Sequence, residues 1–209
     1  MQWKNRVIAG EELARKLIAY QSQPDTLVLG LPRGGVVVAH ALASLLQLPL
    51  DIIVVRKVGA PMNEELAIGA IDETGDGIFQ HELFDILHVT PQYLNQVIQK
   101  EKTEVLRRLQ VYRGNRPPLD LKDKKVIIVD DGIATGATMR VAIANAQTKG
   151  AKKIIVATPV LALDTLEKLS RSADEVIYLY APSSFGAVGQ FYEKFEQTSD
   201  EEVIQLLHL

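Results

Sequence analysis

Residues 126–138, with the sequence VIIVDDGIATGAT, decide the expected fold of this 209-residue chain. Four apolar residues open the stretch, the adjacent carboxylates Asp130 and Asp131 follow, and a glycine-containing loop then leads into a helical pattern. A short and continuous apolar run of this kind is typical of a strand buried in a parallel sheet. The stretch therefore predicts a strand, a ligand-binding loop and the start of a helix.

The predicted loop has the chemistry that a sugar phosphate needs. Backbone N–H groups in the first turn of a helix lack intrahelical partners and lie at the positive end of the helix dipole, so residues 134–138 suit a phosphate dianion. Gly136 permits a close approach, and Thr135 and Thr138 add hydroxyl donors. Asp130 and Asp131 suit the paired hydroxyls of a ribose, because ionised carboxylates only accept hydrogen bonds.

Composition excludes several classes of function. The formal charge of −3 provides no general attraction to nucleic acid or anionic lipid. The chain has no cysteine, which excludes thiolate catalysis and cysteine-ligated zinc, and its four histidines show no metal-binding spacing. No apolar run is long enough to span a bilayer, and the first residues lack a signal-peptide pattern. We therefore expect a cytoplasmic protein with no membrane partner.

The rest of the chain alternates strand-like and helix-like segments, which predicts an α/β fold with a mostly parallel sheet flanked by helices. Thr90 and Pro91 form a typical helix start, and the helix that follows is expected to reach about Arg113. Its apolar side either packs within the subunit, which we expect, or forms a dimer seam. The expected strands are 26–30, 52–55, 67–71, 126–129, 153–158 and 175–180, and the other helices lie near 11–21, 36–47, 138–149 and 162–171.

The central stretch resembles the phosphoribosyl diphosphate (PRPP) signature of the type I phosphoribosyltransferases. The resemblance implies a single domain over residues 1–209 with the type I phosphoribosyltransferase fold, a helical insertion at about 84–118 and a small hood or tail at about 181–209. It also implies that Asp130 and Asp131 are catalytic residues that hold the ribose. The 5′-phosphate would then be bound by the loop residues Ala134, Thr135, Gly136, Ala137 and Thr138.

A second candidate segment, Arg33, Gly34 and Gly35, follows the first predicted strand. It offers one cation and exposed backbone amides to an anion, although a plain glycine-rich turn explains it equally well. The resemblance implies that these three residues meet the diphosphate of PRPP. It further implies a peptide bond that is not trans between Pro32 and Arg33.

A third candidate segment, residues 56–71, begins with the basic pair Arg56 and Lys57. The pair supplies a guanidinium fork and a point charge for phosphate oxygens, and the turn-rich segment could fold over a ligand. The alternative is a solvated basic pair before a hairpin. The resemblance implies a catalytic loop in which both residues stabilise the leaving pyrophosphate. Similar loops carry a further basic residue after the glycine, where this chain has Ala60 and Pro61.

The implied reaction transfers ribose 5-phosphate from PRPP to a nucleobase or similar nitrogen heterocycle, as in nucleotide salvage. Mg²⁺ would arrive with PRPP and contact Asp130 and Asp131 indirectly. Phe185 could stack on the acceptor and Val188 lie at its edge, although aromatic residues of this segment also suit simple packing. Ala134 stands where enzymes for 6-oxopurines usually have aspartate, which disfavours hypoxanthine and guanine as acceptors.

Two other functions are compatible with the sequence. A regulator could keep the PRPP site as a sensor and bind nucleic acid or a protein, with residues 100–116 as the candidate basic surface, although a solvated helix face explains that run more simply. An unrelated dinucleotide-binding enzyme is disfavoured, because no GxGxxG motif follows a strand. A homodimer is compatible with the transferase and with the regulator.

Overall fold

A five-stranded parallel sheet forms the centre of the protein. The computed structural model describes residues 1–208, except for the side chain of Glu65. Residue 209, the last of the predicted hood or tail at 181–209, lies outside the described residues. The strand order is β2-β1-β6-β7-β8. The strands are β1 (Thr26–Gly30), β2 (Leu50–Ile52), β6 (Lys125–Val129), β7 (Lys153–Val160) and β8 (Glu175–Tyr180).

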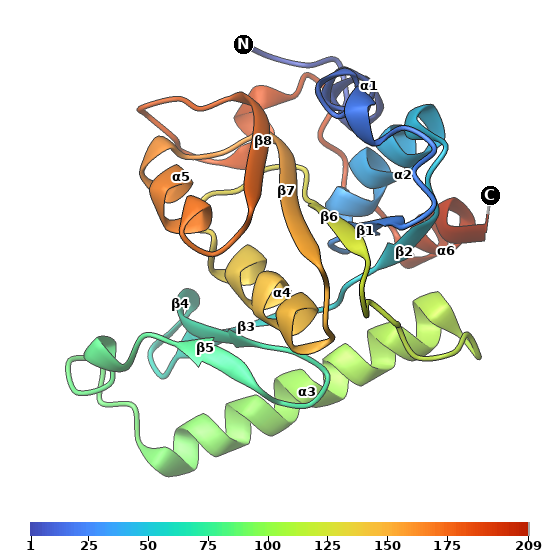
Figure 1. Cartoon of the computed structure of the whole chain (residues 1–209). Helices are drawn as coiled ribbons and strands as arrows, with labels where there is room; N and C mark the ends of the chain where they lie inside the picture. The colour runs from blue at the N-terminus through green and yellow to red at the C-terminus, as the bar shows by residue number, and fades with distance from the viewer. Residues whose placement is uncertain (209) are drawn as a thin grey trace.

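Helices cover both faces of this sheet (Figure 1), as the predicted α/β fold requires. Alternate residues of β6 point to opposite faces: Val126 and Ile128 join the core under α4 and α5, whereas Ile127 and Val129 join the core under α1 and α2. The continuous apolar run of β6 thus reflects burial on both faces. The covering helices are α1 (Arg6–Lys16), α2 (Gly34–Leu46), α4 (Ala137–Thr148) and α5 (Leu163–Ser170), and a short 3-10 turn follows α1 at Ile18–Tyr20.

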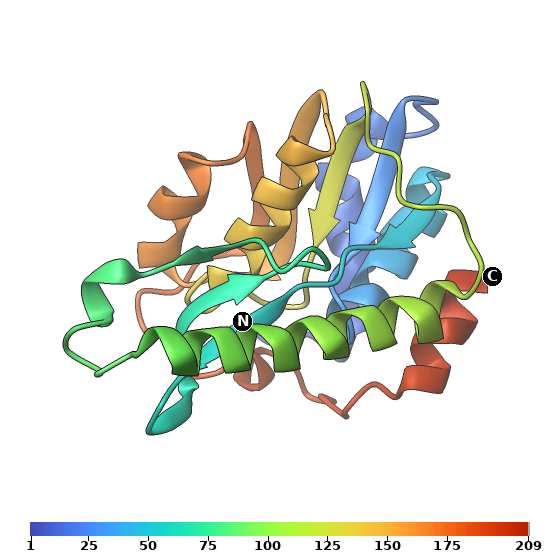
Figure 2. The same ribbon diagram turned by 90° about the horizontal axis from the view of Figure 1, so that it is seen from below.

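A separate three-stranded antiparallel sheet lies below the parallel one, between α4 and the long helix α3 (Pro91–Arg113) (Figure 2). Thr90 caps α3 as expected, because its side chain accepts a hydrogen bond from the Tyr93 amide at 3.1 Å. The strands of this sheet are β3 (Arg56–Ala60), β4 (Asn63–Ile71) and β5 (Gly77–Phe79), in the order β3-β4-β5, followed by a 3-10 turn at His81–Leu83.

Both ends of α3 pack within the subunit, which confirms the first of the two placements expected for its apolar side. Its first half covers the antiparallel sheet, where Val97 packs against the buried Val58. Its second half buries Val105 and Tyr112 against the final helix α6 (Asp200–His208). Among residues 1–208, no helix combines the length and apolar character needed to cross a bilayer.

Two expectations about the segment between β2 and α3 were wrong. Residues 52–55 do not form a strand: β2 ends at Ile52, and the next three residues stay buried while the chain passes to the second sheet. Residues 56–71 form the β3–β4 hairpin, which turns at residues 61 and 62 and shifts register on both sides of Gly59, in place of the expected ligand-covering loop. The strand expected at 67–71 is confirmed as part of β4, where it pairs antiparallel with β3, and β5 was not predicted. Apolar runs report burial, and burial alone does not specify strand pairing.

Candidate active site

The predicted phosphate loop connects β6 to α4 at one edge of the parallel sheet. Gly136, at the N-cap of α4, has a φ of +73°, a conformation that glycine adopts without steric cost. A Cβ atom at this position would lie 2.7 Å from Cγ2 of Thr165 on α5. The Thr165 hydroxyl also donates a hydrogen bond to the Ala134 carbonyl at 2.6 Å. Helix α5 therefore holds the loop in shape, with Ala134 and Thr135 exposed beside the start of α4.

Asp130 and Asp131 lie directly after β6, and burial raises the pKa of both carboxyl groups. The neighbouring charge of Asp131 raises the pKa of Asp130 further. For Asp131, the Arg6 guanidinium opposes the effect of burial without cancelling it. Two half-buried carboxylates side by side repel each other, so a ligand that offers hydroxyl donors or a cation would relieve the pair.

Arg6 on α1 forms an ion pair with Asp131, with 2.7 Å between Nε and Oδ2. The guanidinium lies 3.9 Å from the centroid of the Phe195 ring, and the Tyr192 hydroxyl donates to the Asp131 carbonyl at 2.6 Å. Segments from both ends of the described chain thus secure the second carboxylate. No local pattern signals this cluster, because Arg6 is 125 residues from Asp131 along the chain and the aromatic members lie in a run that resembles ordinary packing.

The predicted diphosphate segment lies against the two carboxylates. A Cβ atom at Gly34 would collide with the Asp131 carboxylate, and one at Gly35 would lie 2.9 Å from Asp130 Oδ1. Both positions therefore require glycine for close packing. The Pro32–Arg33 peptide bond is cis, as the resemblance implied. Arg33 forms an ion pair with Asp200 at the start of α6, at 3.6 Å.

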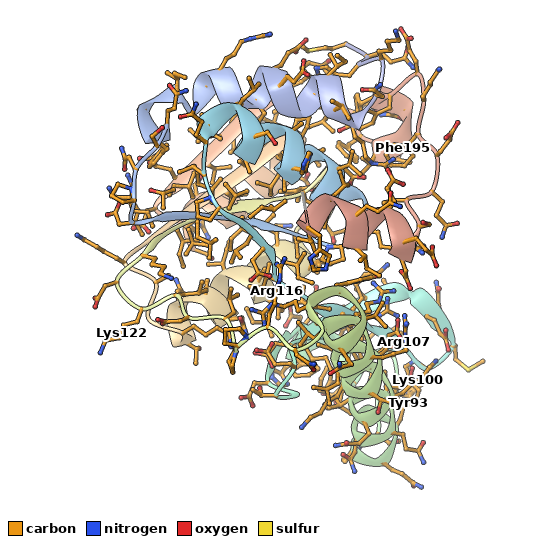
Figure 3. The ribbon with its side chains drawn as sticks, turned by 90° about the vertical axis from the view of Figure 1, so that its right-hand side faces the viewer. Tyr93, Lys100, Arg107, Arg116, Lys122 and Phe195 are labelled. Carbon is orange, nitrogen blue, oxygen red and sulfur yellow. The ribbon has the colours of Figure 1, made fainter. Side chains whose placement is uncertain are left out.

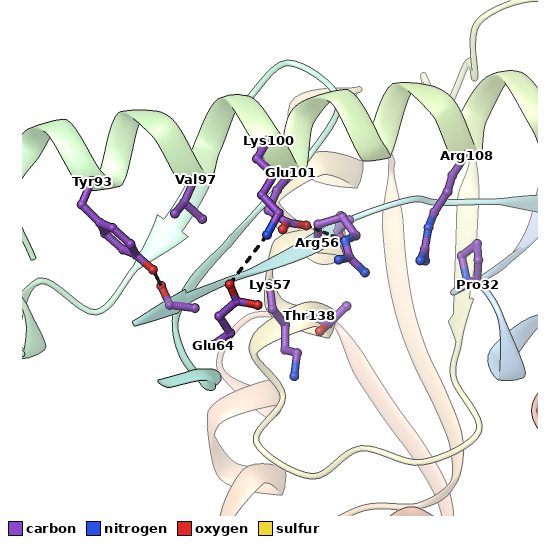
Figure 4. A pocket seen from close by; sticks show the side chains of 12 residues that line it. Pro32, Arg56, Lys57, Glu64, Tyr93, Val97, Lys100, Glu101, Arg108 and Thr138 are labelled. Carbon is purple, nitrogen blue, oxygen red and sulfur yellow. Dashed lines mark hydrogen bonds and ion pairs between the residues drawn. The ribbon is translucent and has the colours of Figure 1, made fainter. Parts of the chain in front are cut away.

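A pocket of about 320 Å³ opens between these segments and α3 (Figure 4). Arg56, Lys57 and Thr138 line it, so two of the three predicted donor-binding segments contribute to one cavity. Pro32, the residue before the predicted diphosphate segment, lines it as well, whereas Arg33, Gly34 and Gly35 do not. Helix α3 forms the opposite wall, which sequence reasoning missed. The remaining lining residues are Val55, Gly59 and Glu64 on the segment 55–64, and Tyr93, Val97, Lys100, Glu101 and Arg108 on α3.

Contacts across the pocket join the β3–β4 hairpin to α3. Arg56 Nε lies 2.7 Å from the buried Glu101 carboxylate, and the Tyr93 hydroxyl donates to the Gly59 carbonyl at 3.0 Å. A longer ion pair of 3.7 Å joins Lys100 to Glu64 at the exposed rim. In Figure 3, Tyr93 and Lys100 project along one side of α3, whereas Phe195 lies close to α1. The seven-residue spacing of Tyr93 and Lys100 places both on one helix face, but the sequence does not show which element that face packs against.

The two residues predicted to meet the acceptor lie outside this pocket. Phe185 is half-buried and packs against Phe191, with 5.2 Å between the ring centroids. Val188 packs on Gly132 of the signature loop, where an added Cβ would collide with it. The structure thus brings Val188 to the signature loop, and it places Phe185 in the adjacent aromatic cluster.

Acidic side chains do not form a metal cage here. Within residues 1–208, no group of three or more histidine, aspartate or glutamate side chains converges on one point. Asp130 and Asp131 are the acidic pair of the signature, and Asp131 is already bound to Arg6. This donor set fits a divalent cation that receives most of its oxygen ligands from a bound substrate.

Comparisons with known proteins agree with this geometry. The family model described as the phosphoribosyl transferase domain matches residues 1–196. The chain belongs to the type I phosphoribosyltransferase family. Proteins from two strains of Mycobacterium tuberculosis, each named "Putative phosphoribosyl transferase", are 43% identical to it over 199 residues. The match covers 95% of this chain and 45% of each relative, so the chain spans less than half the length of these relatives.

A solved structure agrees along nearly the whole chain. The crystal structure of the protein TT1426 from Thermus thermophilus is 38% identical in sequence, with a TM-score of 0.82. The superposition covers 99% of this chain and 98% of that one. The antiparallel sheet, α3 and α6 therefore fall within the span that the two proteins share.

Proposed function

We propose that this protein is a phosphoribosyltransferase that transfers the ribose 5-phosphate group of PRPP to a nucleobase or similar nitrogen heterocycle. The observation that supports this most strongly is the convergence of Pro32, Arg56, Lys57 and Thr138 on one pocket. Arg56 and Lys57 were assigned to the leaving diphosphate and Thr138 to the 5′-phosphate, and Pro32 directly precedes the third predicted segment. Residues from segments far apart in the sequence that meet at one cavity are better explained by one ligand than by unrelated turns.

In this proposal, each end of PRPP has its own segment. The 5′-phosphate binds the amides and hydroxyls of residues 134–138 at the start of α4, where the helix dipole favours an anion. Asp130 and Asp131 face the ribose hydroxyls. Arg33, Arg56 and Lys57, with the amides of Gly34 and Gly35, stabilise the diphosphate as it leaves.

The chemical step breaks one bond and forms another at C1 of the ribose. The C1–O bond breaks, and its electron pair departs with pyrophosphate. A nitrogen lone pair of the acceptor forms the new C1–N bond, and the proton of that nitrogen passes to solvent. The ribose becomes cation-like on the way, as in glycoside hydrolysis, so the half-buried carboxylates Asp130 and Asp131 stabilise the developing positive charge.

Mg²⁺ fits this site as a companion of the substrate. Asp130 and Asp131 would hold it indirectly, through PRPP oxygens and water, in keeping with the absence of a converging acidic cluster in the described part of the chain. When bound, the ion would neutralise charge on the diphosphate. We place the acceptor near Val188 and Phe185, and we keep the expectation that Ala134 disfavours 6-oxopurines.

We further propose one phosphoribosyltransferase domain over residues 1–209, with a helical insertion at about 84–118 and a hood at about 181–209. The cytoplasmic location and a possible homodimer stay predictions from the sequence. None of these affects the assignment of the donor site.

The test is pyrophosphate release from PRPP in the presence of Mg²⁺ across a panel of bases, together with direct titration of PRPP. We expect PRPP to bind and at least one base to stimulate pyrophosphate release. If PRPP binds, no base gives turnover, and the protein instead binds nucleic acid in a salt-sensitive way, the protein is a PRPP-sensing regulator. If PRPP does not bind at all, the donor site itself is wrongly assigned.

A further inference from the structure

Helix α3 contributes more to the pocket than a helical insertion needed only for packing would. The lining residues Tyr93, Val97, Lys100, Glu101 and Arg108 recur along one face of the helix, and three of the five carry a charge. Each of the three has a partner: Lys100 pairs with Glu64, Glu101 with Arg56 and Arg108 with Glu104. A helix face needed only for packing would be apolar, so this face of α3 has the composition of a binding surface.

Arg108 is the α3 residue best placed to meet an anion. Its guanidinium is held by Glu104, one turn earlier, at 2.8 Å, and its side chain is only 18% exposed. Figure 4 shows it extending from α3 toward Pro32, the residue before Arg33 in the diphosphate segment. Arg108 and Arg56 thus approach the same pocket from different elements.

The carboxylates near Arg108 orient it without neutralising the group. Glu104 is shared, because Arg107 also binds it, at 2.7 Å. Hydrogen bonds from these two arginines lower the pKa of Glu104 to about 2, so it carries its full charge at neutral pH. Asp200 also pairs with Arg107, at 3.7 Å, and with Arg33, at 3.6 Å. The three guanidinium groups thus share two carboxylates, which leaves one net positive charge beside the pocket. An oriented guanidinium in a cluster with one unmatched positive charge is suited to a phosphate oxygen.

We propose that α3 is a ligand-binding element and that Arg108 binds the diphosphate group, opposite Arg56. The inference rests on the proposed donor site and adds a cation that comes from a helix outside the signature. The hairpin itself has no basic residue directly after Gly59, because Ala60 and Pro61 stand there. Arg108 supplies a positive charge to the pocket from the opposite side.

The test compares Arg108→Gln with Arg107→Gln. Both arginines lie on α3 and share Glu104, but only Arg108 lines the pocket. Calorimetric titration with inorganic pyrophosphate, PRPP and ribose 5-phosphate separates the two ends of the site. We expect Arg108→Gln to bind pyrophosphate and PRPP about tenfold more weakly, the effect of losing one charge-assisted hydrogen bond, and to bind ribose 5-phosphate normally. Arg107→Gln should bind all three like the wild type.

Other outcomes overturn the proposal in recognisable ways. Equal losses in both variants would show that the Glu104 network matters only for structure. Unchanged pyrophosphate binding by Arg108→Gln would remove Arg108 from the site, while PRPP binding by the wild type would leave the proposed function intact. If Arg108→Gln does not fold, Arg108→Lys keeps the charge without the planar fork, and an affinity for pyrophosphate equal to the wild type in that variant would contradict the assigned hydrogen bond.

Discussion

The two walls of the proposed donor site are built on different physical principles. The signature wall, residues 130–138, of which Thr138 lines the pocket, consists of half-buried carboxylates, backbone amides and a glycine, all fixed by packing against neighbouring elements. The opposite wall contains long cationic side chains on α3 and the β3–β4 hairpin, and the carboxylates of Glu101 and Glu104 orient Arg56 and Arg108. The first wall is preorganised, and its rearrangement would cost packing energy. The cationic side chains of the second wall can exchange a protein carboxylate for a ligand oxygen.

The largest expected effect separates binding from stability in the signature wall. Asp130→Asn should lower the affinity for PRPP by about 100-fold, since two charge-assisted hydrogen bonds are lost. The same variant should unfold at a higher temperature at pH 7. The raised pKa of Asp130 means that its ionised form opposes folding. The wild type therefore loses stability as the pH rises above the ordinary aspartate pKa of about 3.9, and the loss is complete once the pH exceeds the raised pKa.

Thermal unfolding at pH 7 and at pH 4 measures this, with the exposed Asp164→Asn on α5 as the matched control. The gain in stability of Asp130→Asn should shrink as the pH falls. A lower unfolding temperature at pH 7 would show that Asp130 is a stabilising group and that the wall is not strained by its charge.

A smaller effect tests the cationic wall. Arg56→Gln should weaken PRPP binding by about 10- to 30-fold and lower the free energy of unfolding by about 1–3 kcal/mol, because Glu101 is left buried without its cation. The double variant Arg56→Gln with Glu101→Gln should recover most of the stability and none of the affinity. Urea unfolding and PRPP titration measure the two quantities. Recovery of affinity in the double variant would mean that Arg56 serves only to neutralise Glu101.

The smallest effect concerns pH. Glu104→Gln should lower the free energy of unfolding at pH 7 by about 0.5–1 kcal/mol, as expected for a partly exposed ion-pair network. The pKa of Glu104 is lowered from 4.5 to about 2, so its contribution is present above pH 4.5 and disappears as the pH falls toward 2. Urea midpoints at pH 7, 4.5 and 3 measure the difference, with the exposed Glu167→Gln on α5 as control. A difference that stays constant with pH would exclude the ion pairs as its source.

The same two walls differ in how far the sequence predicts them. Strand β1 was predicted with its observed bounds, and β6 to within one residue, because runs buried on both faces leave a continuous apolar pattern. The phosphate loop was predicted because its parts are contiguous. A strand was wrongly predicted at residues 52–55, because a buried apolar stretch that connects two sheets has the same pattern as a strand. The α3 wall and Arg6 were missed because their positions depend on how distant elements pack, which no local pattern encodes.

The ion pair between Arg6 and Asp131 has a consequence for how the protein is made. Trp3 pairs with Tyr192 as an isolated bridge, and Arg6 also donates to the carbonyl of Glu196. Arg6 and Glu196 are 190 residues apart along the chain, so this cluster can close only after residue 196 has been made. Contacts of such long sequence separation cost loop-closure entropy and slow folding. The donor site is thus completed only after residues 192–196 have left the ribosome, and the ability to bind ligand would report that residues 3–6 and 192–196 have come together.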